Sequence, residues 1–570
     1  SDPDASSNLQ YSITFGDGSA PTAWSGTTSY QHVYEDPGHY EVKIQVREAN
    51  APSLTAVEVI TISIAETVSG PLPTKSSPIA LDPNNDRVWT VNPDADSVTR
   101  INATSQSVEQ EFDLRSRLGM NSSIDPRSIA VDYLGNVWIA CKDADTVAIL
   151  DGSSGALIVG IDCGYGSAPV GIAASRNGRD IFVTTEGRGH EAVTGVEGDP
   201  GNGMLLRFDA TGYSFGNAPN ESGSLELGPM PRAIAVFGDG DRALVTRFIS
   251  SHPRGGEVWD VDASNANALS LNGTVYLPVD TTTIGQDGGD LDSSNGSGTP
   301  NYISSITISP DQKWAWYTAV KPDTGRGELY GSELDPDNTV RTIVGRIDLS
   351  GDTPSDQDGS RIDFDNADSA SAVAFSPRGD WGFVTAQGNN LIGIFDHLNI
   401  LSDDSLEARN SRARIPTGSA PQGIVLDDSG HLWVQNFMGR SVTVYDYSDF
   451  FERGRIGADA LTIDTVANER LPDDVLLGKQ IFYHAGDERM SSEGYISCAS
   501  CHFDGMGDGQ VWDFTQRGEG LRNTTDLRGR AGMGHGNVHW TGNFDEIQDF
   551  ENDIRNEFGG LGFLSDADWS

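Results

Sequence analysis

The residues whose types and spacing could do chemistry form one short run near the C-terminal end, Cys498-Ala499-Ser500-Cys501-His502. Two thiols separated by two residues can each bond a haem vinyl group, and the imidazole that follows can bind the iron from one face. A zinc site would need two more ligands at short spacing, and the other two cysteines, Cys141 and Cys163, lie far upstream. The run therefore predicts a covalently attached haem c with His502 as an iron ligand.

Four side chains downstream of the motif are candidates for the second axial ligand: Met506, Met533, His535 and His539. A methionine gives a higher reduction potential, a histidine a lower one, and an open position permits reaction with peroxide. A methionine in a glycine-rich stretch is most often a packing residue, and a histidine there is equally often a surface residue or a neighbour of the ligands. Two histidines so close together favour His539 or His535 as a residue near the haem.

Arginines in the same segment are candidates for binding the haem propionates. Arg522 and Arg528, together with Arg530, follow the motif at short distance. A guanidinium group suits a carboxylate because it donates two parallel hydrogen bonds. A solvated basic loop is the alternative interpretation.

The residues around the motif resemble a known haem domain. Gly478-Lys479-x-x-Phe482 precedes the cysteines, and His539-Trp540-Thr541-Gly542 follows them. This order is similar to the N-terminal haem domain of the di-haem cytochrome c peroxidase family over roughly residues 470 to 560. The resemblance implies electron-transfer or peroxide chemistry, with His539 or His535 as distal ligand or acid/base catalyst and Trp540 assisting electron transfer.

The chain departs from that family in carrying one C-x-x-C-H where the family carries two. One haem favours plain electron transfer. A di-haem peroxidase or oxidase is the alternative if a second haem domain follows residue 570. A structural surface or filament protein with a haem module is a further alternative.

A long repetitive region precedes the haem segment. Seven segments share an apolar opening, a turn of the D/S-x-x-G kind and further short strands, and their openings begin at residues 78, 127, 170, 232, 305, 372 and 422. Short alternating strands bounded by turn residues predict four-stranded antiparallel blades, and seven such units make a closed β-propeller over residues 71–450. The pattern resembles the YVTN or lactonase-like propellers, notably at Asp143-Ala144-Asp145-Thr146-Val147.

Loops inserted between the repeats could bind metals. His190 with Glu186 and Glu191 is one candidate, against the alternative of a solvated acidic loop. Several side-chain oxygens in the glycine-rich run from Gln286 to Asn295 are the ligands that calcium prefers, although the run lacks the EF-hand order.

The first residues form a third unit. Phe15-Gly16-Asp17-Gly18-Ser19 and Pro37-Gly38-His39-Tyr40 resemble the polycystic-kidney-disease (PKD) repeat, an immunoglobulin-like sandwich. Alternation of Val42, Ile44 and Val46 independently predicts a half-buried strand. The expected class is therefore mainly β: a PKD-like sandwich over 1–67 that begins inside the domain, the propeller, and a small α-helical cytochrome c domain over 468–570, for which an incomplete C-terminal end is one alternative.

Composition agrees with an exported protein. The net charge of −45 disfavours nucleic acid and anionic membrane surfaces as partners. No apolar run is long enough to span a membrane. Haem attachment to C-x-x-C-H implies a bacterial periplasm or cell surface, with a redox protein or extracellular electron acceptor as partner and the propeller and PKD units available for self-assembly or surface ligands. A disulfide between Cys141 and Cys163 is left open.

Overall fold

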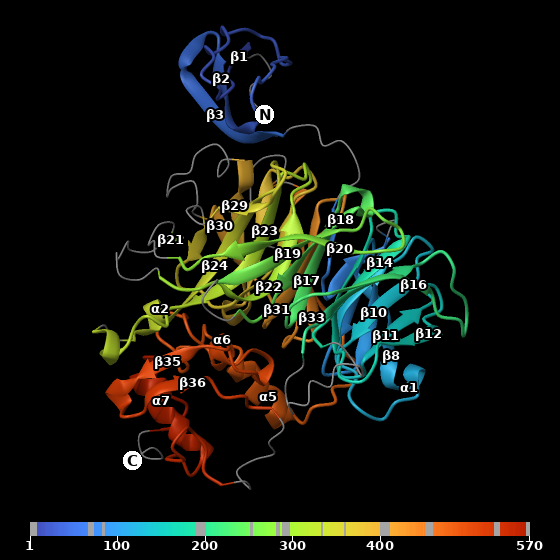
Figure 1. Cartoon of the computed structure of the whole chain (residues 1–570). Coiled ribbons are helices and arrows are strands. Elements are labelled where there is room, and N and C mark those ends of the chain that lie inside the picture. Colours follow the sequence, from blue (N-terminus) through green and yellow to red (C-terminus); the bar gives the residue numbers. More distant parts are fainter. Residues whose placement is uncertain are drawn as a thin grey trace.

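The computed structural model describes residues 8–65, 73–82, 86–187, 201–250, 255–280, 286–287, 297–331, 334–357, 361–398, 411–448, 450, 460–528 and 536–565. Figure 1 shows a small N-terminal sheet at the top, a ring of sheets in the middle and a lobe of C-terminal residues below. The predicted mainly β class is confirmed. In these ranges no helix has both the length and the apolar character needed to cross a bilayer.

The N-terminal unit is an antiparallel sheet in the order β1-β2-β3. Its strands are β1 (Leu9–Thr14), β2 (Gly38–Glu48) and β3 (Ala51–Ile64). β2 contains the alternating run, and Val42 is buried between exposed Glu41 and Lys43. One contact with the ring is made by His39, whose Nε2 lies 3.0 Å from Asp396 Oδ1 and whose ring stacks on Trp381.

Seven sheets form a closed ring, because the first strand of each sheet contacts the first strand of the next and β31 returns to β5. In chain order the sheets contain β5 (Ile79–Leu81), β6 (Arg87–Asn92), β7 (Ser97–Asn102) and β8 (Ser107–Asp113); β9 (Pro126–Val131), β10 (Val137–Cys141), β11 (Thr146–Leu150) and β12 (Leu157–Asp162); β13 (Pro169–Ala174), β14 (Asp180–Thr185), β15 (Met204–Asp209) and β16 (Asn220–Glu226); β17 (Pro231–Phe237), β18 (Arg242–Arg247), β19 (Gly256–Asp262) and β20 (Ser270–Leu277); β22 (Asn301–Ile308), β23 (Trp314–Pro322) and β24 (Val340–Asp348) with β21 (Gln286–Asp287), β25 (Ser355–Asp356) and β26 (Ile362–Phe364); β27 (Ala370–Phe375), β28 (Trp381–Ala386), β29 (Leu391–Asp396) and β30 (Ala413–Pro416); and β31 (Pro421–Leu426), β32 (His431–Asn436), β33 (Ser441–Asp446) and β34 (Ala460–Asp464).

This arrangement is a β-propeller, and the predicted openings coincide with its inner strands. The seventh sheet ends with β34, beyond the predicted boundary at residue 450. Short elements join the strands: α1 (Leu114–Leu118), η1 (Gly238–Gly240), η2 (Glu328–Tyr330), α2 (Pro336–Thr339) and η4 (Gln387–Asn389).

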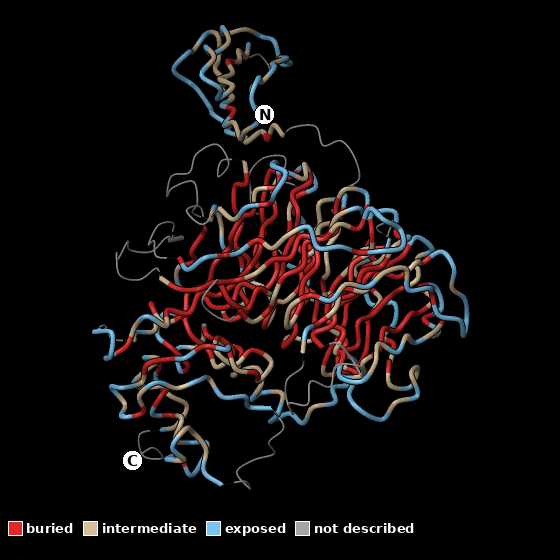
Figure 2. The backbone as a smooth tube through the Cα atoms, in the orientation of Figure 1, coloured by how far each residue is buried: buried red, intermediate tan, exposed pale blue. Residues whose placement is uncertain are grey.

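The repeated turns explain why the sheets recur. Asp132 accepts hydrogen bonds from two backbone N–H groups of its own turn and from Trp138 Nε1 at 3.0 Å. Asp427 does the same with Trp433 Nε1 at 2.9 Å. An aspartate that closes its own turn and fixes a tryptophan sets both the hairpin and the packing between blades. The buried residues accordingly form clusters shared by neighbouring sheets, and they lie along the strands of the ring (Figure 2).

The segment before the first blade lies inside the channel of the propeller. β4 (Thr74–Lys75) pairs antiparallel with β17, and Lys75 Nζ donates a hydrogen bond to the backbone oxygen of Val373 in β27. Further along, the N–H of Ile129 in β9 donates to Ser77 O. Since these partners belong to inner strands of different blades, residues 74–77 run through the middle of the ring.

The lower lobe contains α5 (Asp473–Phe482), α6 (Cys498–Cys501), η5 (Phe503–Gly505), β35 (Val511–Phe514), η6 (Thr515–Arg517), β36 (Gly520–Asn523), η7 (Ile547–Phe550) and α7 (Glu551–Asn556). The prediction of an α-helical domain is not supported in the described part of this lobe, where the helices are short and a two-stranded sheet intervenes. Turn-forming glycines such as Gly505, Gly509 and Gly518, all at positive φ, interrupt the helical pattern.

The two propeller cysteines are free thiols. Cys141 ends β10, whereas Cys163 follows β12, and β11 lies between those strands. Two strand spacings put the backbones roughly 10 Å apart, beyond the reach of a disulfide. The disulfide left open by the sequence is therefore absent.

Candidate haem-attachment site

The cysteine motif forms the single-turn helix α6. Ser497 is its N-cap and forms a capping box with Ser500, whose hydroxyl accepts the Ser497 N–H at 2.9 Å. A helical turn places residues three apart on one face, so Cys498 and Cys501 can present their thiols together. The backbone oxygen of Cys501 accepts a hydrogen bond from the Tyr302 hydroxyl of the propeller at 2.8 Å.

The state of these side chains suits covalent haem attachment. Burial raises the pKa of the Cys498 thiol to about 11, and it raises that of Cys501 as well, so both side chains are neutral thiols at neutral pH. No group of three or more metal-binding side chains gathers among the residues that the structure describes.

The histidine of the motif has capacity for one more bond. His502 Nδ1 is buried without a hydrogen-bond partner. Burial also lowers the pKa of His502, which favours the neutral imidazole that a metal ligand must be. Leu527, whose N–H donates to Gly505 O at 2.7 Å, keeps apolar surface exposed beside the motif loop. An imidazole with an unpaired nitrogen, two neutral thiols and nearby apolar surface fit a haem.

The turn after the motif closes the mouth of the propeller channel. Phe503 is buried against Phe248 and Tyr302, with ring centroids 5.3 and 5.8 Å away. Its ring borders a cavity of about 80 Å³ that is lined by the inner ends of the blades, including Ser128 and Ser371. The motif is therefore held directly against the propeller axis.

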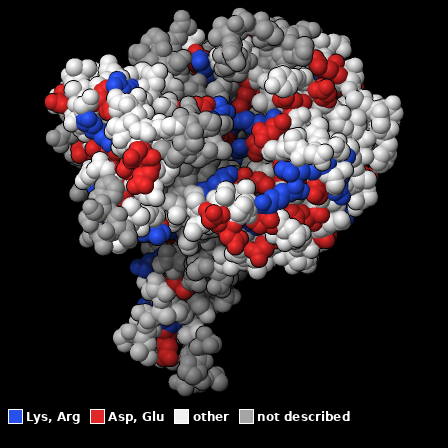
Figure 3. All heavy atoms as spheres, turned by 90° about the horizontal axis from the view of Figure 1, so that it is seen from below, with Lys and Arg blue, Asp and Glu red and all other residues white. Residues whose placement is uncertain are grey.

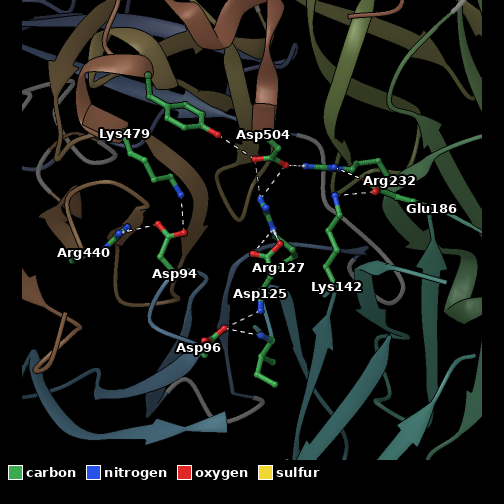
Figure 4. Close-up of polar contacts among 12 residues, drawn as sticks. Asp94, Asp96, Asp125, Arg127, Lys142, Glu186, Arg232, Arg440, Lys479 and Asp504 are labelled. Atoms are coloured by element: carbon green, nitrogen blue, oxygen red, sulfur yellow. Dashed lines mark hydrogen bonds and ion pairs between the residues drawn. The ribbon is translucent and has the colours of Figure 1, made fainter. Parts of the chain in front are cut away.

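Asp504 anchors this turn in a group of charged residues (Figure 4). Its carboxylate accepts from Arg127 Nη1 at 3.1 Å, from Arg232 Nη2 at 3.2 Å and from the Tyr483 hydroxyl at 3.2 Å. Burial opposes ionisation of Asp504, but Arg127 and Arg232 outweigh it and hold the pKa of the carboxyl far below its usual range. Its side chain is only 7% exposed.

Three more residues complete the charge balance around Asp504. Arg127 also pairs with Asp125 at 2.8 Å, and Arg232 pairs with Glu186 at 2.6 Å. Lys142 Nζ lies 2.8 Å from the other oxygen of Glu186. We call these six residues, Asp125, Arg127, Lys142, Glu186, Arg232 and Asp504, the mouth network. Its cations and carboxylates are equal in number, which is what a largely buried charge cluster requires.

A second contact joins α5 to the ring. Lys479 Nζ lies 2.7 Å from Asp94 Oδ1, and Arg440 Nη2 lies 2.8 Å from Asp94 Oδ2. Asp94 lies in the first blade and Arg440 in the last. Seen from below, Lys and Arg side chains gather on this face with Asp and Glu between them (Figure 3). The lobe is thus docked by paired charges in a strongly acidic chain.

His539 lies in an aromatic cluster of the lower lobe. Its ring stacks on Phe544 at 4.4 Å and lies 4.2 Å from the Trp540 ring. Nδ1 is 2.8 Å from Asn543 Oδ1 and 3.7 Å from Glu519 Oε1. Partners of this kind fix the orientation of a histidine and leave Nε2 as the nitrogen that could bind a metal.

The other predicted residues of the lobe have protein partners. Arg522 pairs with Glu519 at 3.2 Å, and Arg528 pairs with Asp526 at 2.6 Å while more than half exposed. Trp540 Nε1 donates to Asn523 O at 2.7 Å. Met506 is buried in a cluster with Phe248, Tyr302 and Trp512, so its side chain packs against the propeller.

Comparison with known proteins finds a family match at the N-terminal end and a fold match over about two thirds of the chain. Residues 1–61 match the PKD domain family. No curated protein matches the chain. Hydrazine synthase of Kuenenia stuttgartiensis aligns with a TM-score of 0.51 and 17% identity over 68% of this chain and 97% of that chain.

Two other solved structures align at lower scores. A streptogramin B lyase gives a TM-score of 0.39 and 17% identity over 63% of this chain and 89% of its own. The dihydro-haem d1 dehydrogenase NirN in complex with DHE gives a TM-score of 0.38 and 14% identity over 81% of this chain and 74% of its own. The similarity to hydrazine synthase shows a shared fold.

Several predicted residues lie outside the described ranges: Arg530, Met533, His535, His190, Glu191 and the side chains of the run from Gln286 to Asn295. Glu186, the remaining member of the candidate loop metal site, is paired with Lys142 and Arg232 instead. Sequence reasoning missed the mouth network. In four blade openings, the residue that follows proline lines the channel mouth: Arg127, Val170, Arg232 and Gln422. Arginine at two of these equivalent positions was the signal for an acidic partner.

Proposed function

We propose that this chain is an exported c-type haem protein that transfers electrons, with the haem held by Cys498, Cys501 and His502. The observation that supports the proposal best is the motif itself, on a helical turn that is fixed by Asp504 to the propeller. A bound haem would supply a one-electron redox centre. The propeller and PKD domain then serve to hold and present that centre to a partner in the periplasm or at the cell surface.

Several residues of the chain hold the attachment turn in one position. Ser497 caps the attachment helix, and Phe503 lies between the motif and the channel cavity. Asp504 fixes the turn after the motif through ion pairs with Arg127 and Arg232. Tyr302 fixes the backbone at Cys501. A rigidly held haem needs little rearrangement when its charge changes, which suits electron transfer.

Covalent haem is the first test. When the chain is produced in a bacterium with a c-type maturation system, we expect one haem per chain that stays attached on a denaturing gel. The double variant C498A/C501A should carry none, because both thioether positions are lost. Haem content is measured from the spectrum in alkaline pyridine. A wild-type chain without haem, in a host that loads a known c-type cytochrome, would contradict the proposal.

The position of His539 supports a second candidate function, that of a peroxidase-type oxidoreductase. Its ring is oriented by Asn543 and Glu519 and touches Trp540, as a distal ligand or an acid/base catalyst would need. The peroxidase-type function requires a second haem domain after residue 570. Added peroxide would change the spectrum of such an enzyme and leave that of an electron-transfer protein unaltered.

His539→Ala tests the distal ligand. If His539 binds the iron, we expect the oxidised spectrum to change from low-spin to high-spin in most molecules, since a strong-field nitrogen is lost. His484→Ala, a change of a half-buried histidine in the same lobe, is the control and should leave the spectrum unaltered. An unchanged spectrum in His539→Ala would assign the ligand to another residue.

A further inference from the structure

A buried carboxylate of the propeller lies directly against the haem-attachment helix. Asp368, in the loop between β26 and β27, is 1% exposed. Ser497 Oγ donates to its Oδ2 at 2.7 Å, and Ser500 Oγ donates to its Oδ1 at 2.8 Å. Ser497 precedes Cys498 and Ser500 precedes Cys501, so both hydroxyls belong to the attachment turn.

Asp368 differs from Asp504 in its lack of a cation. Its third partner is the Ser369 hydroxyl at 2.7 Å, and none of the ion pairs in the described part of the chain includes it. Asp504, in contrast, faces two arginines. Three hydroxyl donors stabilise a carboxylate by hydrogen bonds without cancelling its charge. The charge of Asp368 therefore acts on its surroundings.

The surrounding backbone is shaped to hold this carboxylate. Asn389 Oδ1 accepts the N–H of Asp368 at 2.6 Å, and the N–H of Gly388 donates to Asp368 O at 3.1 Å. A Cβ at Gly388 would meet Asp368 Oδ2 at 2.4 Å, so only glycine fits there. The η4 turn thus forms a cradle that fixes the carboxylate under α6.

We propose that Asp368 is a positioning residue for the haem: it fixes Ser497 and Ser500 of the attachment turn, and its uncompensated charge lowers the reduction potential. The inference rests on the proposed function, because it presupposes a haem on Cys498 and Cys501. A buried negative charge stabilises the oxidised, more positive iron relative to the reduced one. The propeller would then set the potential of the centre that it holds.

Redox titration of haem-loaded Asp368→Asn tests the proposal. At a fixed applied potential and pH 8, we expect the ratio of reduced to oxidised haem to rise about tenfold over wild type, a shift of about +59 mV for a one-electron couple. Burial raises the pKa of Asp368 to about 6, so the wild-type carboxylate is still ionised at pH 8. An unchanged midpoint in the loaded variant would overturn the proposal.

Asp365→Asn is the matched control. Asp365 lies in the same loop and accepts a hydrogen bond from Tyr495 of the lower lobe, but Arg341 Nη2 lies 3.8 Å from it and opposes its charge. Its variant should shift the midpoint much less, and an equal shift would overturn the specific role of Asp368. If Asp368→Asn gives no soluble protein, Asp368→Ser provides an uncharged hydroxyl and is judged by the same midpoint criterion. Absence of haem from wild type would instead refute the proposed function.

Discussion

Asp504→Asn is expected to lower the free energy of unfolding by about 3 kcal/mol, because it leaves Arg127 and Arg232 with one carboxylate too few in a largely buried cluster. The asparagine keeps the shape and some hydrogen bonds, so the loss reports the charge. The lobe should also become easier to cleave from the propeller by a protease. Denaturant titration and timed proteolysis measure the two effects.

Asp526→Asn is the control for this change. Asp526 pairs with Arg528 in the same lobe, and both side chains are about half exposed. Exposed pairs contribute about 0–1 kcal/mol, so the control should lie near wild type. Equal stability losses in the two variants would show that the mouth network does not anchor the lobe.

Lys75→Met is expected to stabilise the protein near neutral pH. Burial lowers the pKa of Lys75 in the channel to about 7, whereas in the unfolded chain it has its ordinary value of 10.5. Between these values the unfolded chain binds more protons, so the wild-type free energy of unfolding rises with pH from about 7 to about 10.5. At and below pH 7 the full cost of burying the ammonium is present. Removing the amine removes this dependence.

The stability gain of Lys75→Met is limited because solvent reaches part of the Lys75 side chain. Lys75 is half-buried, so we place the gain of Lys75→Met at about 2–3 kcal/mol at pH 7, below the full value of the pKa shift, and it should shrink as the pH approaches 10. Denaturant titrations at pH 7 to 10 measure the difference. Lys43→Met, at an exposed strand position, should show no such trend. A constant difference across the range would contradict a charge-based cost.

Local patterns predicted the parts of the fold that local sequence controls. Aspartate turns such as those of Asp132 and Asp427 bond their own backbone, so they mark their blades without reference to distant residues. The docking of the lobe depends on Asp504 meeting Arg127 across hundreds of residues, and no periodicity reports that pairing. Asp368 could not be identified for the same reason, since its side-chain partners are the serines Ser369, Ser497 and Ser500, which carry no signal of a distant carboxylate.

The predicted helical character of the lobe is not supported in the part that the structure describes. The family resemblance implied a helical domain, whereas the described part of the lobe has short helices interrupted by glycines at positive φ. His539 was chosen on proximity in the sequence, and the structure gives it oriented partners in Asn543 and Glu519. Whether it meets the iron stays a prediction.

The segment that runs through the channel ties the start of the propeller to the closure of its ring. Residues 74–77 touch inner strands of several blades, so these strands have their full set of hydrogen bonds only with the segment in the channel. Closure is secured where Thr465, just after β34, exchanges hydrogen bonds with Asn92 of the first blade. The closed propeller therefore depends on a residue before its first blade and on a residue after its last. The cysteine turn seals the mouth of that ring, where Asp504 meets an arginine from each of two blades.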